Sequence, residues 1–231
     1  MYFSRVRIAP EGLNRQEFFN LLSGSAYTHH KLLWKLFSDH DKRVFLFRQE
    51  LEEKAVSLDR RPRGLPIFYV LSRAEPLPVP GLLNCETKRF EPSLQKGQKL
   101  AFSLRANPVV AKRRPEKKNS SHHDVLMNAK ATAKEQGIGD QRRISEAMDE
   151  AARSWLHDRS KKCGFSLSVI PEVHGYNQHV QRRKGRTIRF SSVDYQGILE
   201  VTEPDSFKET LFNGLGRSRA FGCGLMLVRR C

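Results

Sequence analysis

Apolar and polar residues alternate along residues 2–8, and this period of two predicts a β-strand. Two short and mainly apolar segments, residues 44–49 and 66–72, also predict strands, and residues 86–90 predict a further short one. Residues 14–37 instead repeat apolar positions at helical spacing, with an interruption near Gly24 and Ser25, and residues 74–82 are proline-rich and predict an irregular or briefly helical connection. The resulting order of strand, helix, two strands, connection and strand is that of the ferredoxin-like split βαβ unit.

The rest of the chain predicts a second unit with the same order and additional elements. Predicted strands are residues 99–105, 165–170, 173–180, 187–193, 197–202 and 225–229, and predicted helices are 125–136, 144–159 and 204–212. Residues 109–124 are basic and polar, which indicates an exposed, mobile loop. We therefore expect an α+β protein with tandem ferredoxin-like domains, residues 1–92 and 93–231, each an antiparallel sheet with helices packed on one face.

Net charge extends the prediction from the fold to a class of partner. The 41 lysine and arginine residues outnumber the 25 aspartate and glutamate residues, so the formal net charge is +16. Such an excess destabilises a folded chain by self-repulsion, and a polyanionic partner explains it best. Nucleic acid is favoured over an anionic membrane surface, because the sequence contains no strongly amphipathic basic helix. The charge leaves one alternative open, a basic scaffold or ribosome-associated protein that has no single binding site.

Apolar runs and cysteine positions indicate where the protein works. No apolar run approaches the roughly 20 residues needed to cross a bilayer, and the first residues predict a strand rather than a signal peptide. Cys85, Cys163, Cys223 and Cys231 form no C-x-x-C pair, and His122, His123 and His157 lack the spacing of metal ligands. We therefore expect a cytoplasmic protein with no metal site and no small-molecule cofactor.

Two adjacent histidines open the helix that follows the first predicted strand. At about 100° per residue, His29 falls among Leu32 and Leu33 on the apolar side, so it is expected to be structural. His30 falls on a neighbouring, less apolar side with Tyr27 and Trp34. A partly exposed histidine can exchange a proton near neutral pH, which makes His30 a candidate general acid or base.

A predicted hairpin carries the most concentrated positive charge of the chain. Residues 173–193 contain no acidic residue, and the turn near Lys184 and Gly185 joins two alternating segments. The candidate RNA-binding side chains of this hairpin are Arg182, Arg183, Lys184, Arg186 and Arg189. A solvated hairpin is the alternative, as it is for the basic loop at residues 112–118.

A glycine-rich segment connects the last predicted helix to the last strand. Its glycines are Gly214, Gly216, Gly222 and Gly224, and its cations are Arg217 and Arg219. The spacing is not that of a dinucleotide-binding loop, since Arg219 stands where the third glycine is needed, and no P-loop lysine is present. Glycines of this kind let backbone N–H groups approach a phosphate, although a turn that needs glycine only for its geometry is the alternative.

Four of these segments together resemble the CasE family of CRISPR RNA endonucleases from the type I-E Cascade complex. They are MYFSRVRIAP at the start, Tyr27-x-x-His30 before LLWKLF, Leu104 to Pro108, and the glycine-rich segment. The resemblance implies two ferredoxin-like (RRM-like) domains and cleavage of precursor CRISPR RNA at the base of the repeat hairpin. It also implies that the product stays bound for the multi-subunit surveillance complex, so that repeat RNA and other Cascade subunits are the expected partners.

The resemblance also assigns roles to residues of this chain. It implies His30 as the catalytic residue, Tyr27 as its partner, and RNA contacts from Arg105, from residues 182–186 and from the glycine-rich segment. The reaction it implies needs no metal: the ribose 2′-OH attacks the adjacent phosphate and leaves a 2′,3′-cyclic phosphate and a 5′-OH. A non-catalytic RNA-binding module of the same fold is the main alternative, although the RRM aromatic signature is not apparent.

Overall fold

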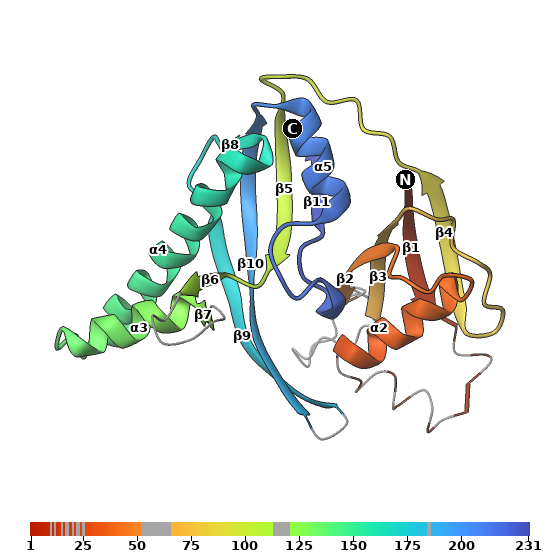
Figure 1. Cartoon of the computed structure of the whole chain (residues 1–231), viewed down its shortest axis with the longest axis horizontal. Helices are drawn as coiled ribbons and strands as arrows, with labels where there is room; N and C mark the ends of the chain where they lie inside the picture. Colours follow the sequence, from red (N-terminus) through yellow and green to blue (C-terminus); the bar gives the residue numbers. More distant parts are fainter. Residues whose placement is uncertain are drawn as a thin grey trace, which may run out of the picture. The chain divides into compact units, whose positions relative to one another are not determined.

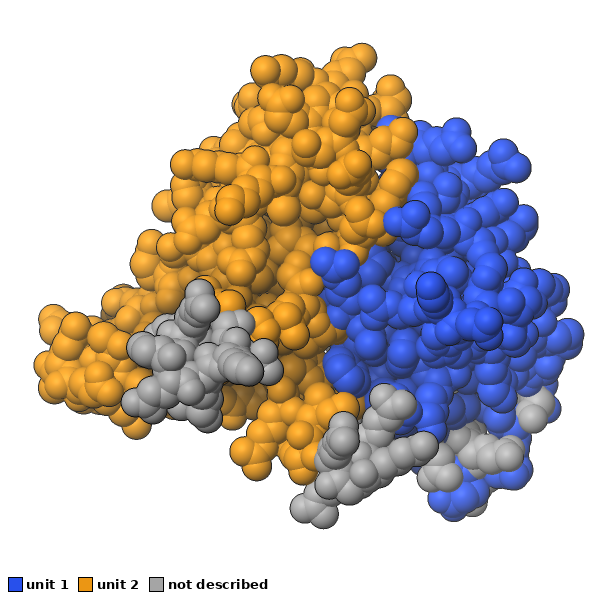
Figure 2. Space-filling view, viewed as in Figure 1, with its two compact units in different colours: residues 1–92, 219–225 blue, residues 93–218, 226–231 orange. Residues whose placement is uncertain are grey.

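A main antiparallel sheet organises each of the two units of the chain in the computed structural model (Figures 1 and 2). Unit 1 comprises Met1–Pro92 with Arg219–Leu225, and unit 2 comprises Ser93–Ser218 with Met226–Cys231. The structure describes residues 1–9, 11, 13, 14, 16, 19, 21, 24, 26–51, 66–112, 121–183 and 186–231. We propose that the units are the two predicted domains, with residues 219–225 added to the first.

Unit 1 is a four-stranded sheet with one described α-helix. Its elements are β1 (Tyr2–Ile8), α2 (Ala26–Trp34), the 3-10 helix η2 (Lys35–Phe37), β2 (Phe45–Leu51), β3 (Pro66–Ser72) and β4 (Leu83–Arg89). The strand order β2-β3-β1-β4 is that of the ferredoxin-like fold, and every pair is antiparallel. The alternation that predicted β1 is confirmed, because Ser4, Val6 and Ile8 are buried while their neighbours are partly exposed. Leu33, Phe37 and Phe68 are among the fully buried residues of its core.

Unit 2 repeats the ferredoxin-like order with insertions. Its elements are β5 (Lys99–Ala106), β6 (Val109–Lys112), β7 (Ser121–Asp124), α3 (Val125–Glu135), α4 (Gln141–Ser160), η3 (Lys161–Cys163), β8 (Phe165–Leu167), β9 (Glu172–Arg183), β10 (Arg186–Val201), α5 (Pro204–Asn213) and β11 (Met226–Arg230). The sheet order is β11-β5-β10-β8, and β9 pairs with β10 as well. Figure 1 shows β9 and β10 running beyond the other strands as a long ribbon.

The predicted strands 187–193 and 197–202 are wrong as separate elements, since both belong to the single strand β10. Residues 194–196 separated them in the prediction, but these residues pair with β5 without a break, and Gly197 continues the pairing opposite Phe102. A Cβ atom at Gly197 would lie 3.3 Å from the Phe102 ring and 3.4 Å from Pro171. The glycine therefore allows close packing inside a strand and does not end it.

The predicted loop at residues 109–124 is wrong at both ends, where β6 and β7 pair as a two-stranded sheet. The carbonyl oxygen of Val109 accepts hydrogen bonds from Trp155 Nε1 at 3.1 Å and from Arg159 Nη2 at 3.0 Å. These contacts from α4 hold the first strand, and a composition-based prediction cannot detect them. Residues 113–120 lie outside the described part of the chain. The predicted strand 165–170 is also shorter than expected, ending at Leu167.

Gly164 is expected to be the most sensitive glycine of the unit 2 core. It ends η3 with a φ of 74°, and an added Cβ would lie 2.5 Å from the Glu203 carbonyl oxygen and 2.6 Å from the Phe207 nitrogen. Gly164→Ala combines left-handed strain of about 1–2 kcal/mol with overpacking of about 1–3 kcal/mol, measurable by urea denaturation. Gly137→Ala is the matched control, because its φ is 77° but nothing lies within 4 Å of the added atom. Equal losses in both variants would contradict this prediction.

Candidate functional site

The two adjacent histidines of α2 have the different environments that helical geometry predicted. His29 is 1% exposed, and its Nε2 donates a hydrogen bond to the Leu21 carbonyl oxygen at 2.9 Å. Its ring lies 5.2 Å from that of Phe68 in β3. His30 is only partly buried. The prediction that His29 points into the core is therefore confirmed, and His30 remains the candidate for chemistry.

Burial of His29 makes the stability of unit 1 depend on pH. Desolvation lowers the pKa of His29, and its contacts with Leu21 and Gln49 offset this only in part. Because the unfolded chain then binds this proton more readily, stability is present above the unfolded pKa of about 6.5 and is lost as the pH falls below it. We expect His29→Gln to show a shallower loss of unfolding free energy between pH 7 and pH 5.5. A loss as steep as that of the wild type would argue against a neutral buried His29.

The His30 imidazole lies among three aromatic rings. The ring of Trp34, one turn further along α2, is 6.2 Å away and nearly perpendicular. The Phe45 ring is 5.7 Å away, and the Phe47 ring stacks on the imidazole at 6.1 Å with an interplanar angle of 13°. Rigid aromatic neighbours restrict the rotamers of the imidazole, so its nitrogen atoms keep a fixed direction, as proton transfer requires.

Tyr27 begins the same helical turn that carries His30. Its side chain is partly buried, and the Lys31 ammonium lies 5.0 Å from the centre of its ring. An i, i+3 spacing places Tyr27 and His30 on neighbouring positions of the helix surface. The helix therefore presents a phenol, an imidazole and an ammonium group within its first two turns.

The second half of the glycine-rich segment packs against this helix inside unit 1. The 3-10 helix η4 (Arg219–Phe221) contacts both α2 and β2. Gly222 follows with a φ of 81°, and an added Cβ would lie 3.4 Å from the Phe47 ring that stacks on His30. Gly222 thus has a geometric role, because it lets the segment approach the aromatic rings around the candidate residue.

Arg219 brings positive charge to this part of unit 1, and it is joined there by Arg43. Burial and repulsion from the Arg219 guanidinium lower the pKa of Arg43, so the two side chains lie within electrostatic reach of one another. Sequence reasoning missed Arg43, because it stands in the short turn before β2 with no motif around it. Two guanidinium groups within electrostatic reach of one another attract an anion.

The first half of the glycine-rich segment belongs to unit 2. Gly214 ends α5, and its N–H bonds to the Thr210 carbonyl oxygen at 2.9 Å. Gly216 has a φ of 84°, and an added Cβ would lie 3.3 Å from Trp155. Arg217 is exposed, and Gly224 is a buried glycine of unit 1 with a φ of 92°. The turn needs several of these glycines for geometry, so their contact with RNA stays a prediction.

The basic hairpin has the predicted strand pairing. Arg183 pairs with Arg186 and Arg182 with Thr187, while Arg189 lies opposite Val180 and is exposed. Lys184 lies outside the described residues, as do the side chains of Arg182, Arg183 and Arg186.

Arg105 lies where the ribbon joins the main sheet of unit 2. Its Nε and Nη2 each donate to a carboxylate oxygen of Asp194 at 2.9 Å, a bidentate pair with side-chain exposures of 28% and 12%. The predicted contact of Arg105 with RNA would therefore have to form while its guanidinium group is paired with Asp194.

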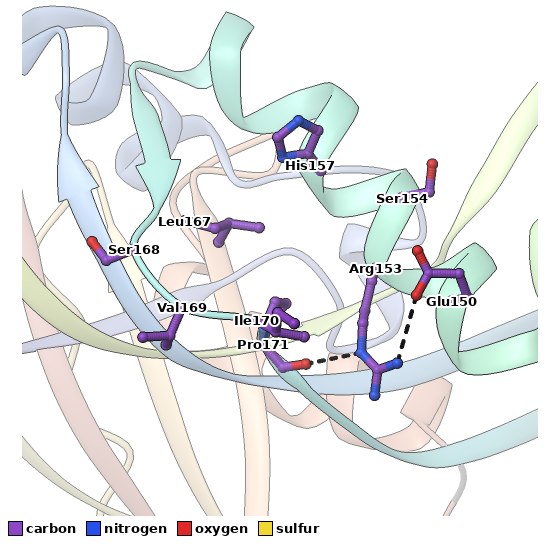
Figure 3. A pocket seen from close by; sticks show the side chains of 9 residues that line it. All are labelled: Glu150, Arg153, Ser154, His157, Leu167, Ser168, Val169, Ile170 and Pro171. Atoms are coloured by element: carbon purple, nitrogen blue, oxygen red, sulfur yellow. Dashed lines mark hydrogen bonds and ion pairs between the residues drawn. The ribbon is translucent and has the colours of Figure 1, made fainter. Parts of the chain in front are cut away.

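Two hollows of unit 2 lie near these elements. One, of about 520 Å³, is lined by α4 and the segment between β8 and β9, and Figure 3 shows Arg153 bridging from Glu150 to the Pro171 carbonyl oxygen beside it. It contains none of the predicted site residues. The other, of about 580 Å³, is lined by Arg189 and Arg217 among others.

Two searches of the described residues complete the site description. Among them, no three His, Cys, Asp or Glu side chains gather closely enough to hold a metal ion. Of the helices that the structure describes, none has the length and apolar character needed to cross a membrane.

Comparison with known proteins gives a match along nearly the whole chain. A family model described as CRISPR associated protein matches residues 1–230. The chain is 25% identical to the CRISPR system Cascade subunit CasE of Escherichia coli over 232 residues, covering 98% of each protein. It is 30% identical to the CRISPR-associated endoribonuclease Cse3 of Thermus thermophilus over 152 residues, covering 61% of this chain and 60% of that protein.

Solved structures agree with the fold assignment. The endoribonuclease Cse3 bound to a 19-nucleotide RNA aligns with a TM-score of 0.67 at 24% identity, over 99% of this chain and 100% of that one. Cas6e from Escherichia coli aligns with a TM-score of 0.60 at 22% identity, over 100% of both chains. The predicted α+β architecture of tandem ferredoxin-like units is thereby confirmed.

Proposed function

Because the chain belongs to the family of CRISPR associated proteins, we propose that it is the CasE-type endoribonuclease of a type I-E Cascade complex. It cleaves precursor CRISPR RNA at the base of the repeat hairpin without a metal ion, and it retains the mature guide RNA for the surveillance complex. The observation that carries this proposal is the placement of His30, partly exposed on α2 and oriented by three aromatic rings.

In the proposed reaction, the RNA supplies its own nucleophile. The ribose 2′-OH attacks the adjacent phosphorus in line with the leaving 5′ oxygen, and the P–O5′ bond breaks. The products are a 2′,3′-cyclic phosphate and a 5′-OH. His30 removes the proton of the 2′-OH or protonates the leaving oxygen, and such a step contributes about 10²–10⁴-fold to the rate.

Neighbouring groups of unit 1 assist this proton transfer. Tyr27 orients the scissile phosphate from the same helix. Arg219 and Arg43, which lie within electrostatic reach of one another, offset the negative charge that develops on the phosphorane. Holding the nucleotide with the 2′-OH in line supplies a further large part of the acceleration.

Unit 2 supplies the grip on the hairpin in this proposal. The β9–β10 ribbon has arginines in the sequence at its tip and Arg189 along its length, and residues 173–193 contain no carboxylate to compensate their charge. An excess of +16 charges over the chain favours binding to the phosphates of a stem. The first half of the glycine-rich segment belongs to the same unit, and its Arg217 adds a contact from the cavity that it lines together with Arg189.

Cleavage and binding of one labelled repeat hairpin distinguish the enzyme from a non-catalytic module. We expect the purified chain to cut the repeat of its own CRISPR array once, at the base of the stem, and to stay bound to the product. A hairpin of equal length with a scrambled stem is the control and is expected to remain intact. Tight, specific binding of the repeat without any cutting would favour the non-catalytic module, and equal binding of both hairpins would favour a basic scaffold.

A further inference from the structure

The cavity of about 580 Å³ in unit 2 has a composition that the proposed cleavage reaction does not use. It is lined by the β9–β10 ribbon, the start of α3 and the first half of the glycine-rich segment. The residues that characterise it are Asn107, Asp124, Met127, His179, Phe190 and Arg217. Its volume is within the range of about 300–1,000 Å³ that is typical of sites for small ligands.

An aromatic pair forms one wall of this cavity. The rings of His179 and Phe190 lie opposite one another on the ribbon and stack at 4.5 Å with an interplanar angle of 15°. His179 Nε2 is also 2.8 Å from Ser192 Oγ. Burial and the nearby Arg105 guanidinium lower the pKa of His179, which favours the neutral form of the stacked imidazole. Such a pair suits the flat face of a nucleobase.

Two apolar side chains around the cavity are left open to solvent. Val180 is 63% exposed and Met127 is 38% exposed, and both line the cavity. Exposed apolar side chains beside a stacked aromatic pair indicate a surface that an apolar, planar group can cover.

Asn107 contributes a buried hydrogen-bonding group to the cavity. Asn107 is only 5% exposed, and its side-chain Nδ2 donates a hydrogen bond to Ser218 Oγ at 2.6 Å. Ser218 adopts a φ of 56°, which a residue other than glycine rarely does. No hydrogen-bond partner of Asn107 Oδ1 is found within the described residues. A buried acceptor in this state is costly unless a donor reaches it, and a ligand N–H is such a donor.

The charges that face the cavity favour an anion. Arg189 and Arg217 are exposed cations on its lining. Asp124 is its carboxylate, and both oxygens of that group are engaged. Oδ1 accepts the backbone N–H groups of Leu126 and Met127, and Oδ2 accepts the Tyr176 hydroxyl at 2.9 Å. The cations therefore remain to attract a phosphate.

We propose that this cavity binds a single unpaired nucleotide of the substrate RNA. The base stacks on the Phe190–His179 pair and donates an N–H to Asn107 Oδ1, and the phosphate is held by Arg189 and Arg217. That the nucleotide belongs to an RNA rests on the proposed function, whereas the fit of the cavity to a nucleotide rests on its lining residues alone. The lining residues belong to unit 2, whereas His30 belongs to unit 1, and the proposal gives the cavity a role in recognising RNA and none in bond cleavage.

Titration of the His30→Ala protein with mononucleotides tests the chemistry of the cavity directly. Calorimetry or NMR measures the binding of AMP, CMP, GMP and UMP, with ribose 5-phosphate and inorganic phosphate as the comparison ligands. At least one nucleotide is expected to bind more tightly than ribose 5-phosphate, and Phe190→Leu is expected to weaken that binding by about five- to twentyfold. Equal binding of ribose 5-phosphate and every nucleotide would overturn the proposal.

Two further variants guard against an effect that comes only from misfolding. Phe212→Leu removes a partly buried ring from the same unit, outside the cavity, and is expected to leave nucleotide binding unchanged. Arg217→Gln alters an exposed side chain and is expected to weaken nucleotide and ribose 5-phosphate binding alike. If Phe212→Leu lowers nucleotide affinity as much as Phe190→Leu, the assigned stacking site is wrong.

The source of the nucleotide is tested with repeat hairpins that carry one abasic residue at successive unpaired positions. In the His30→Ala protein, an abasic residue at one of these positions is expected to weaken binding about five- to twentyfold. When Phe190→Leu is added, that abasic residue is expected to make no difference. If mononucleotides bind but no abasic position matters, the RNA source is wrong. Both experiments measure affinity and not cleavage. A chain that binds RNA without cutting it would therefore refute the proposed cleavage activity but not the nucleotide site.

Discussion

His30→Ala is expected to slow cleavage of the repeat hairpin by about 10²–10⁴-fold, because proton transfer to or from the reacting oxygens is lost. Affinity for the hairpin is expected to stay within about twofold, since phosphate contacts by arginine and lysine supply most of the binding. Single-turnover cleavage and equilibrium binding, measured on the same preparation, separate the two effects. Loss of cleavage through weaker binding alone would show that His30 positions the RNA and does not act in the reaction.

Two controls belong with this measurement. Because the imidazole packs against Trp34, Phe45 and Phe47, its truncation also opens space among these rings. His30→Gln keeps most of that volume but cannot exchange a proton near neutral pH, so it is expected to be as inactive as His30→Ala. His29→Gln changes the adjacent buried histidine and is expected to retain cleavage. The opposite pattern, with His29→Gln inactive and His30→Gln active, would transfer the catalytic role to His29.

Replacement of the ribose by a 2′-deoxyribose at the scissile nucleotide is expected to abolish cleavage completely. The proposed nucleophile is then missing, and the proposed mechanism uses no other nucleophile. Binding is expected to change little, since the substitution removes one hydroxyl from a long contact surface. The measurement compares hairpins with a single deoxyribose at the scissile position and at the nucleotide on either side of it.

The flanking substitutions are the controls for this substrate, and they are expected to be cut at nearly the normal rate. Cleavage of the scissile deoxyribose hairpin at its original position would contradict attack by the 2′-OH. A nuclease that activates water would then be indicated, because such an enzyme does not depend on that hydroxyl.

Local pattern predicted most of the fold, and the reasons are visible at particular residues. Strand β1 could be predicted because its alternating residues alternate in burial. His29 and His30 could be separated because 100° per residue places neighbours on different sides of a helix. Strand β10 was divided wrongly at residues 194–196, since the pairing that continues the strand there is with β5, which is distant in sequence.

The parts of the site that sequence could not predict all depend on long-range contacts. Arg43 becomes a candidate because it interacts electrostatically with Arg219, and Arg105 forms an ion pair with Asp194. The assignment of residues 219–225 to unit 1 depends on the packing of η4 against α2 and β2. Periodicity and composition contain no information about such pairings, so the candidate residues could be named while their partners could not.

The most direct test of the central claim is cleavage of the labelled repeat hairpin by the wild-type chain in excess EDTA, with analysis of the product ends. The account predicts the same single-turnover rate with EDTA as with magnesium, a 2′,3′-cyclic phosphate on the upstream product and a 5′-OH on the downstream one. A reaction that stops in EDTA and resumes with added magnesium, or products that carry a 5′-phosphate, would contradict it.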